Sequence, residues 1–290
     1  MIRNAETRWP PVGQFVSVDG ARVHYVRAGS GPPLVLIHGA SGNVRDWTFA
    51  LLARLVERFD VIAFDRPGHG YSERIKGAHS PHVQAAHLRK AAAALGVARA
   101  VVVGHSYGGT IALTWACDAP ETVDALGLIC APSHEWEGSA GRLYDLGDHP
   151  VIGPAFSYIY PRLATEGLVE DALTRIFAPN PVPEGYAEHI GPGLAVRYAT
   201  VRANSADIAR LKPYLIAQTP RYPNLPMPVL QIHGTDDTIV PLHIHSERLK
   251  AALPGSELLV WEGVGHMPHH ARPDEALAAL TSLAQTPVGI

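Results

Sequence analysis

The chain has 290 residues, 47% of them hydrophobic and 18% charged, which is enough to build one large α/β domain or two small ones. Its net charge is −3 and it has no run of Lys or Arg, which argues against nucleic acid or an anionic membrane as a partner. No secretory signal pattern opens the chain and no apolar stretch could span a bilayer, so we expect a cytoplasmic protein.

The predicted elements begin with a β-hairpin, because polar and apolar residues alternate on both sides of Asp19-Gly20. Buried strands and helices then alternate along the chain, which is typical of a mostly parallel sheet covered on both faces. We expect strands at 32–39, 60–65, 100–103 and 123–132, and helices at 44–58, 81–96 and just after residue 106.

This alternation stops after Pro132, and residues 133–225 contain only short amphipathic helical patterns rich in Pro, Gly and Tyr. Strands resume at 228–234 and 256–263, with helices near 242–252 and 272–285. We therefore expect a core domain formed by 1–132 and 226–290, interrupted by a helical cap at 133–225. An insertion at the carboxyl ends of parallel strands lies over the ligand crevice.

Ser106 lies where a buried strand passes into a helix, in the sequence Gly104-His105-Ser106-Tyr107-Gly108. This G-x-S-x-G pattern between strand and helix predicts a nucleophile in a sharp, strained turn. A side chain in place of either glycine would collide with neighbouring elements, and the first amides of the helix would face a reacting carbonyl. The alternative, a serine that only caps the helix, leaves the downstream acid and histidine unexplained.

A serine nucleophile needs a base and an orienting acid, and candidates for both follow in the chain order Ser, acid, His. Asp236 and Asp237 lie in the loop after the strand at 228–234, and Glu135 is a third candidate acid. His266, in a loop after the last strand, is the predicted general base.

Four further histidines and the two cysteines are not assigned to catalysis. We expect His269 and His270 to be exposed or to face the cap, and His243 and His245 to lie on the surface. The H-x-x-H-H pattern at 266–270 lacks accompanying carboxylate or cysteine ligands and is interrupted by proline, so we expect no metal. Both cysteines lie in apolar segments, so we predict free thiols at Cys117 and Cys130.

Five blocks together resemble the α/β-hydrolase fold family in its cap-bearing serine hydrolase branch: HGASGNVRDW (38–47), FDRPGHGYS (64–72), GHSYGG (104–109), GTDDTIVP (234–241) and GVGHMPHH (263–270). The resemblance covers about residues 15–285 and implies an eight-stranded, mostly parallel sheet with helices on both faces and a helical cap. It favours Asp237 over Asp236 as the acid of a Ser106, Asp237, His266 triad. It also implies an oxyanion hole from the Ala40 and Tyr107 amides, and a structural loop at 65–70.

The implied chemistry is acyl transfer to water without a cofactor, with a small-molecule ester and water as the only partners and a monomer or dimer as the assembly. A serine nucleophile argues against the aspartate-based chemistry of dehalogenases and epoxide hydrolases. We expect a small to medium, mainly apolar carboxylic ester, held in part by the cap residues Trp136, Phe156, Tyr158 and Tyr160. Three alternatives stay open: a carbon–carbon bond hydrolase of ring-cleavage products, a cofactor-free perhydrolase or haloperoxidase, and a non-catalytic ligand-binding protein on the same fold.

Overall fold

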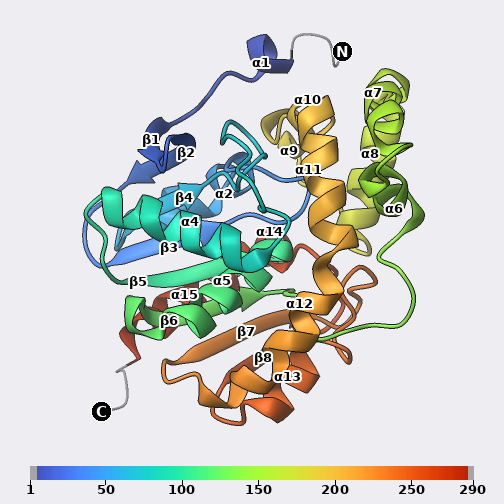
Figure 1. The fold of residues 1–290 in the computed structure, drawn as a ribbon. Helices are drawn as coiled ribbons and strands as arrows, with labels where there is room; N and C mark the ends of the chain where they lie inside the picture. Colours follow the sequence, from blue (N-terminus) through green and yellow to red (C-terminus); the bar gives the residue numbers. More distant parts are fainter. Residues whose placement is uncertain (1–4, 287–290) are drawn as a thin grey trace.

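A single eight-stranded sheet organises the computed structural model, which describes residues 5–286 (Figure 1). Its strand order is β1-β2-β4-β3-β5-β6-β7-β8, and all neighbours from β4 to β8 are parallel. The β1–β2 hairpin and the β2–β4 pair are antiparallel, as expected for the hairpin. The strands are β1 (Gln14–Val18), β2 (Ala21–Ala28), β3 (Pro33–Ile37), β4 (Asp60–Phe64), β5 (Ala100–His105), β6 (Val123–Ile129), β7 (Val229–Gly234) and β8 (Glu257–Trp261).

The pleat divides the buried strand residues between two hydrophobic cores, one on each face of the sheet. Along β3, Val35 and Ile37 join one cluster, while Leu34 and Leu36 join the other. The first cluster includes side chains of α4 (Pro81–Ala94), α5 (Tyr107–Asp118), α12 (Leu211–Gln218) and α13 (Ser246–Ala252). The second includes side chains of α2 (Arg45–Thr48), α3 (Leu51–Leu55) and α15 (Pro273–Gln285). The predicted two-sided α/β sheet is therefore confirmed.

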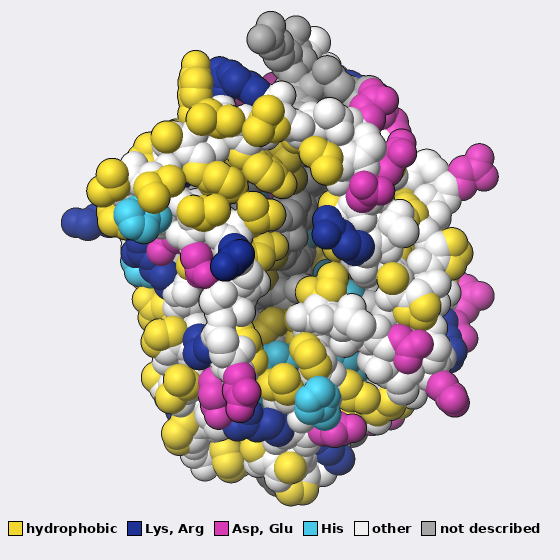
Figure 2. All heavy atoms as spheres, turned by 90° about the vertical axis from the view of Figure 1, so that its right-hand side faces the viewer, with side chains coloured by type: hydrophobic (Ala, Val, Ile, Leu, Met, Phe, Trp, Pro, Cys, Tyr) yellow, Lys and Arg dark blue, Asp and Glu magenta, His cyan; other side chains and the backbone are white. Residues whose placement is uncertain are grey.

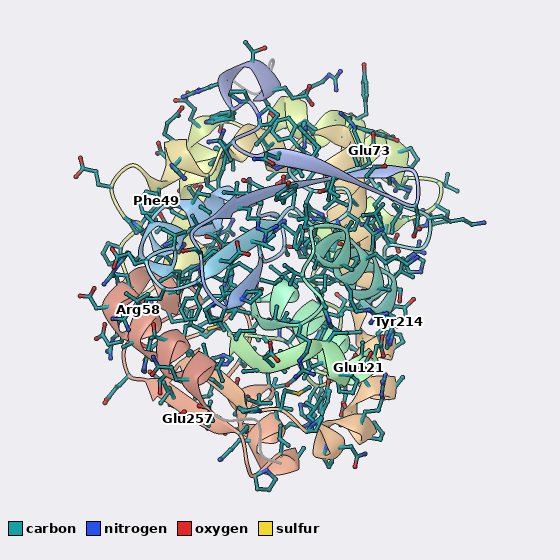
Figure 3. The ribbon with its side chains drawn as sticks, turned by 90° about the vertical axis from the view of Figure 1, so that its left-hand side faces the viewer. Phe49, Arg58, Glu73, Glu121, Tyr214 and Glu257 are labelled. Carbon is teal, nitrogen blue, oxygen red and sulfur yellow. The ribbon has the colours of Figure 1, made fainter. Side chains whose placement is uncertain are left out.

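The two edges of the sheet lie at opposite ends of the molecule. In Figure 3 the labelled Glu257, the first residue of β8, lies at the bottom, while Glu73 lies near the top. Glu73 accepts hydrogen bonds from Arg22 of β2, next to the β1 edge. The central strands β3, β5 and β6 therefore have further strands on both sides. Residue 106, which directly follows β5, lies at the carboxyl end of this central part of the sheet.

Residues 133–225 contain helices and no strand in the structure. These helices are α6 (Arg142–Asp148), α7 (Gly153–Leu163), α8 (Glu166–Phe177), α9 (Tyr186–His189), α10 (Pro192–Ala195), α11 (Tyr198–Ala209), α12 and the 3₁₀ turn η2 (Thr219–Asn224). Short helices elsewhere are α1 (Ala5–Arg8), η1 (Pro120–Thr122) and α14 (Pro268–Ala271). None of the helices described between residues 5 and 286 has the length and apolar character needed to cross a membrane.

The first helices of residues 133–225 expose many large apolar side chains. Figure 2 looks onto this side of the molecule and shows hydrophobic side chains gathered there beside a hollow. The exposed set on α6–α8 and the turn between α6 and α7 is Leu143, Leu146, Val151, Ile152, Tyr158, Ile159, Leu163 and Leu168.

One predicted helix differs in the structure. The helix expected at 44–58 is divided into α2 and α3, because Ala50 adopts φ −145°, outside the helical region. Leu51, Leu52 and Leu55 still bury their side chains against the sheet, so the apolar periodicity was interpreted correctly while the break was missed.

Candidate active site

Ser106 occupies a strained turn between β5 and α5. Its backbone has φ 53° and ψ −125°, a conformation that a residue with a side chain adopts only when its surroundings impose it. The Ser106 amide donates to the Ile129 carbonyl at 2.8 Å, which ties the turn to the end of β6. A Cβ atom on Gly104 would lie 2.2 Å from the Gly108 carbonyl oxygen, and one on Gly108 would lie 2.2 Å from that of Ile37. Both glycines are therefore required by close backbone approach.

Asp237 and His266 form a buried hydrogen-bonded pair, with Nδ1 of the imidazole 2.7 Å from Oδ2 of the carboxylate. The other carboxylate oxygen accepts the amides of Ile239 and Val240 at 2.9 and 2.8 Å. Burial opposes ionisation of Asp237, but its electrostatic interaction with His266 and the hydrogen bonds from His233, His266 and the Val240 amide outweigh it and hold its pKa well below the usual range. Asp237 is therefore an anion that can orient His266.

The neighbouring candidates for the acid lie elsewhere. Asp236 is exposed, and its carboxylate accepts a hydrogen bond from Thr235. Glu135 forms an ion pair of 2.8 Å with Arg248. Of the three candidates, only Asp237 contacts the His266 imidazole in the part of the chain that the structure describes.

Nε2 of His266 has no hydrogen-bond partner within residues 5–286, and no bond joins it to the Ser106 hydroxyl in this structure. Such bonds often tighten only when substrate is bound, and a free Nε2 is what a general base needs. The carbonyl of His266 accepts a bond from His105, the residue before the serine, so the two loops are joined directly.

The Ala40 and Tyr107 backbones lie beside Ser106. A Cβ atom on Gly39 would be 3.1 Å from Cβ of Ser106, and Tyr107 is the first residue of α5. Ala40, Ser106 and Tyr107 all line one cavity of about 870 Å³. The first amides of a helix lack partners within the helix and can bind an anionic oxygen.

The cavity is mainly apolar, and it reaches from the sheet to residues 133–225. Trp136 and Tyr144 line it, together with Ile208, Leu211, Ile239, Val240 and Ile244. The predicted pocket residues Phe156, Tyr158 and Tyr160 are not among its lining residues; they lie on α7, where Tyr158 is 57% exposed and Phe156 packs on Tyr160. Of these four predicted residues, Trp136 lines the same cavity as Ser106.

The charged groups on the cavity wall are two carboxylates and one guanidinium within the described residues, namely Glu135, Glu137 and Arg248. The ion pair lowers the pKa of Glu135, so its carboxylate is charged at neutral pH. His245 also lines the cavity, and burial lowers its pKa to about 3, which leaves it neutral. The wall therefore has no net positive charge to attract an anionic substrate.

Two expectations about histidines were wrong. His245 is buried rather than on the surface, and its Nδ1 is satisfied there because it accepts the Ser133 amide at 3.2 Å. His269 is fully buried against Trp47, since it packs in the core near Asp46 rather than against the cap. His270 is also buried, and it does pack on Phe177 and Tyr186 of residues 133–225. His243 is exposed as expected.

Two buried groups bring possible metal-binding atoms within 4.8 Å of one another. One is Asp46, His105 and His269; the other adds Cys130 to the Asp237–His266 pair. The Asp46 carboxylate is already engaged by Tyr186 and His270, at 2.8 Å each.

Both cysteines are free thiols, as predicted, with Cys117 partly buried and Cys130 buried.

Comparisons with known proteins add a family to this geometry. The model of the alpha/beta hydrolase family matches residues 34–280. The chain belongs to this family. A 2-hydroxymuconate semialdehyde hydrolase of Pseudomonas sp. strain CF600 is 31% identical to this hydrolase, over 93% of each chain. The solved esterase RhEst1 of Rhodococcus sp. ECU1013 is 26% identical over 96% of this chain and all of its own, with a TM-score of 0.76.

A third neighbour, the enol-lactonase of Burkholderia xenovorans LB400, has a TM-score of 0.77 and covers 94% of this chain and all of its own, but at 20% identity it supports the fold alone. The predicted family and the eight-stranded α/β-hydrolase sheet are therefore confirmed. The relatives include both esterases and carbon–carbon bond hydrolases, so family membership leaves the bond that this hydrolase cleaves undetermined.

Proposed function

We propose that this hydrolase cleaves a neutral carboxylic ester through an acyl-enzyme on Ser106. The observation that carries the proposal is the strained turn at Ser106, which opens onto the same cavity as Ala40 and Tyr107. Strain of this kind is kept where the rest of the fold imposes it, and a hydroxyl lifted above a sheet beside free amides suits attack on a carbonyl.

In the proposed mechanism, Nε2 of His266 takes the Ser106 proton as the oxygen attacks the carbonyl carbon. Asp237 holds Nδ1–H and stabilises the imidazolium that forms. The Ala40 and Tyr107 amides donate to the oxygen that becomes negative. His266 then protonates the leaving alcohol and activates a water molecule, which releases the acid and restores Ser106.

The cavity supports a small to medium, mainly apolar substrate. Trp136 and its aliphatic neighbours provide apolar surface, while Glu135, Glu137 and Arg248 leave the wall without excess positive charge. A carboxylate substrate would enter such a cavity against the charge of the two glutamates. The geometry therefore supports a neutral ester better than an anionic one, and water is the second substrate.

Carbon–carbon bond hydrolysis is the second candidate, because the relative that is 31% identical over 93% of each chain acts on 2-hydroxymuconate semialdehyde. The names of that substrate and of 2-hydroxy-6-oxo-2,4-heptadienoate, the substrate of another relative, describe carboxylates. On this chain the Arg248 charge is already paired with Glu135, and Glu137 adds a second carboxylate to the cavity wall. The charge balance of the wall makes the carbon–carbon reaction the less favoured of the two.

One kinetic comparison tests the proposal. The purified protein is assayed with p-nitrophenyl esters of increasing acyl length and with a 2-hydroxy-6-oxo-dienoate. We expect kcat/KM for the best ester to exceed that for the dienoate by at least about 100-fold. Preference for the dienoate would overturn the ester proposal in favour of the second candidate. Peroxide with acetate tests perhydrolysis, and an inert Ser106 in every assay would leave only the ligand-binding alternative.

A further inference from the structure

Arg66 lies directly behind the proposed oxyanion hole, in the 65–70 loop that the sequence suggested was structural. Its side chain is fully buried, which is rare for a guanidinium and requires several acceptors. Nε donates to the His38 carbonyl at 3.1 Å and Nη2 donates to the Gly39 carbonyl at 3.2 Å. Arg66 thus contacts the two carbonyls that immediately precede Ala40.

The Gly39 carbonyl and the Ala40 amide belong to one peptide unit, so fixing the first fixes the second. In a planar trans peptide the C=O and N–H point in opposite directions. His38 secures the same carbonyl, with Nδ1 2.8 Å from the oxygen. Its Nε2 accepts the Arg66 amide at 3.0 Å, so the proton is on Nδ1 and can be donated. With the carbonyl held from behind by His38 and Arg66, the Ala40 N–H is directed away from them, toward the side of the cavity.

Arg66 also contacts the second proposed donor residue. Its guanidinium carbon lies 4.6 Å from the centre of the Tyr107 ring, at the start of α5. A cation at the carbonyl end of a peptide polarises it, which strengthens the hydrogen bond that its N–H can donate. The buried charge is thereby placed to favour a negative oxygen at Ala40 without touching the substrate.

Helix α11 holds Arg66 in this position. Asp207, fully buried on α11, accepts Nη1 of Arg66 at 2.9 Å on one oxygen and Nη2 of Arg74 at 2.7 Å on the other. Asn204, one turn earlier on the same helix, accepts the Ser41 amide at 2.8 Å and donates to the Ser41 hydroxyl at 3.0 Å. One face of α11 therefore holds the loop on both sides of Ala40.

From these contacts we propose that Arg66 is a positioning residue of the oxyanion hole, which orients and polarises the Gly39–Ala40 peptide while Asp207 of α11 holds its guanidinium. The inference rests on the proposed function, since it requires the Ala40 amide to bind an oxyanion. It gives α11 a role in assembling the reaction centre, in addition to its place among the helices of residues 133–225.

The test compares Arg66→Lys with Arg74→Gln. Lysine keeps a charge for Asp207, but its single nitrogen cannot serve the His38 and Gly39 carbonyls and Asp207 together. Arg74→Gln removes the other partner of the same carboxylate and leaves the Gly39–Ala40 peptide untouched. Each variant alters one ion pair of the buried Asp207 carboxylate, so a role confined to balancing that carboxylate predicts similar effects from the two.

We expect Arg66→Lys to lower kcat about tenfold or more, with KM changed by less than about threefold; removing a whole oxyanion donor costs about 10²–10³. Binding of a trifluoromethyl ketone, which mimics the tetrahedral intermediate, should weaken by the same factor as kcat/KM. Arg74→Gln should leave both values near wild type. If Arg66→Lys does not fold, Arg66→Gln combined with Asp207→Asn removes both charges and is measured in the same way.

A folded Arg66 variant with wild-type kcat and wild-type ketone affinity would overturn the inference, as would equal losses in the Arg74 variant. These results can be distinguished from failure of the proposed function. If the proposed function is wrong, a fluorophosphonate will not label Ser106 even in the wild-type protein, where Arg66 is intact.

Discussion

Replacing Asp237 by asparagine should disable catalysis through the tautomer of His266. In the native protein Oδ1 of Asp237 accepts the Ile239 and Val240 amides, while Oδ2 faces Nδ1 of His266 at 2.7 Å. In Asp237→Asn the two backbone donors still require an oxygen, so the amide nitrogen takes the place of Oδ2. That nitrogen donates, and Nδ1 of His266 must then be the unprotonated one.

The size of the effect follows from this geometry. With its proton on Nε2, the imidazole cannot accept the Ser106 proton, and the productive tautomer would place two donors 2.7 Å apart. Loss of the orienting acid in such triads costs about 10⁴ in kcat, or about 5 kcal/mol of transition-state stabilisation. We therefore expect a kcat about 10⁴-fold below wild type at pH 7, with the fold preserved.

The assay is steady-state hydrolysis of the best p-nitrophenyl ester, with circular dichroism to confirm folding. Asp236→Asn is the matched control: it makes the same chemical change one residue earlier, on an exposed side chain bonded to Thr235, and should retain activity within about twofold. If Asp237→Asn kept more than a tenth of wild-type activity, or if Asp236→Asn were the inactive one, the assignment of the orienting acid would be refuted.

Two further predictions concern folding. Gly108→Ala should lower the free energy of unfolding in urea by at least about 2 kcal/mol, because the new Cβ would lie 2.2 Å from the Ile37 carbonyl oxygen. The control Gly255→Ala, whose Cβ would have no atom within 4 Å, should change it by less than about 1 kcal/mol. Equal effects of the two variants would contradict the close backbone approach in the turn at Ser106. Stability should also fall as the pH drops from about 6.5 toward 4, because burial lowers the pKa of His269 to about 4 and of His245 to about 3. As the pH falls, the unfolded chain protonates these two histidines before the folded protein does, so each can lower the free energy of unfolding by up to about 1.4 kcal/mol per pH unit. A free energy of unfolding that stays constant or rises over this pH range in urea titrations would contradict the burial of His269 and His245 as neutral side chains.

The strained turn at Ser106 could be predicted from the sequence because the residues that determine it lie close together in the chain. A buried β5, a serine between two glycines and an apolar α5 follow one another within 19 residues, Ala100–Asp118, and close backbone approach leaves no alternative residue at Gly104 or Gly108. The sheet could be predicted for a similar reason, since each central strand is a short apolar run whose alternate residues face two helical layers.

The contacts that sequence reasoning missed join residues far apart in the chain. Arg66 meets Asp207 across 141 positions, and His270 meets Asp46 across 224, so neither partner is visible from local pattern. A polar residue looks exposed until its surroundings are known, which explains the errors at His245, bonded to Ser133, and at His269, packed on Trp47. For Arg66 one signal was available: a charged residue two positions past the end of the buried strand β4 must either be solvated or find buried partners.

The helices of residues 133–225 were harder to assign in detail for a related reason. Aromatic residues on amphipathic helices suit both a pocket and a helix interface, and composition cannot distinguish the two. Trp136 lines the cavity, while Phe156 and Tyr160 pack on one another along α7. The division depends on how the helices rotate over the sheet, which only the three-dimensional structure gives.

The proposed mechanism requires Ser106 to become covalently acylated, and this acyl-enzyme can be trapped. The protein is mixed with a p-nitrophenyl ester, quenched in acid within the first turnovers, digested and analysed by mass spectrometry. We expect one acyl group, on the peptide that contains Ser106, and no adduct in Ser106→Ala. Turnover with the acyl group on another residue, or undiminished turnover by Ser106→Ala, would contradict it.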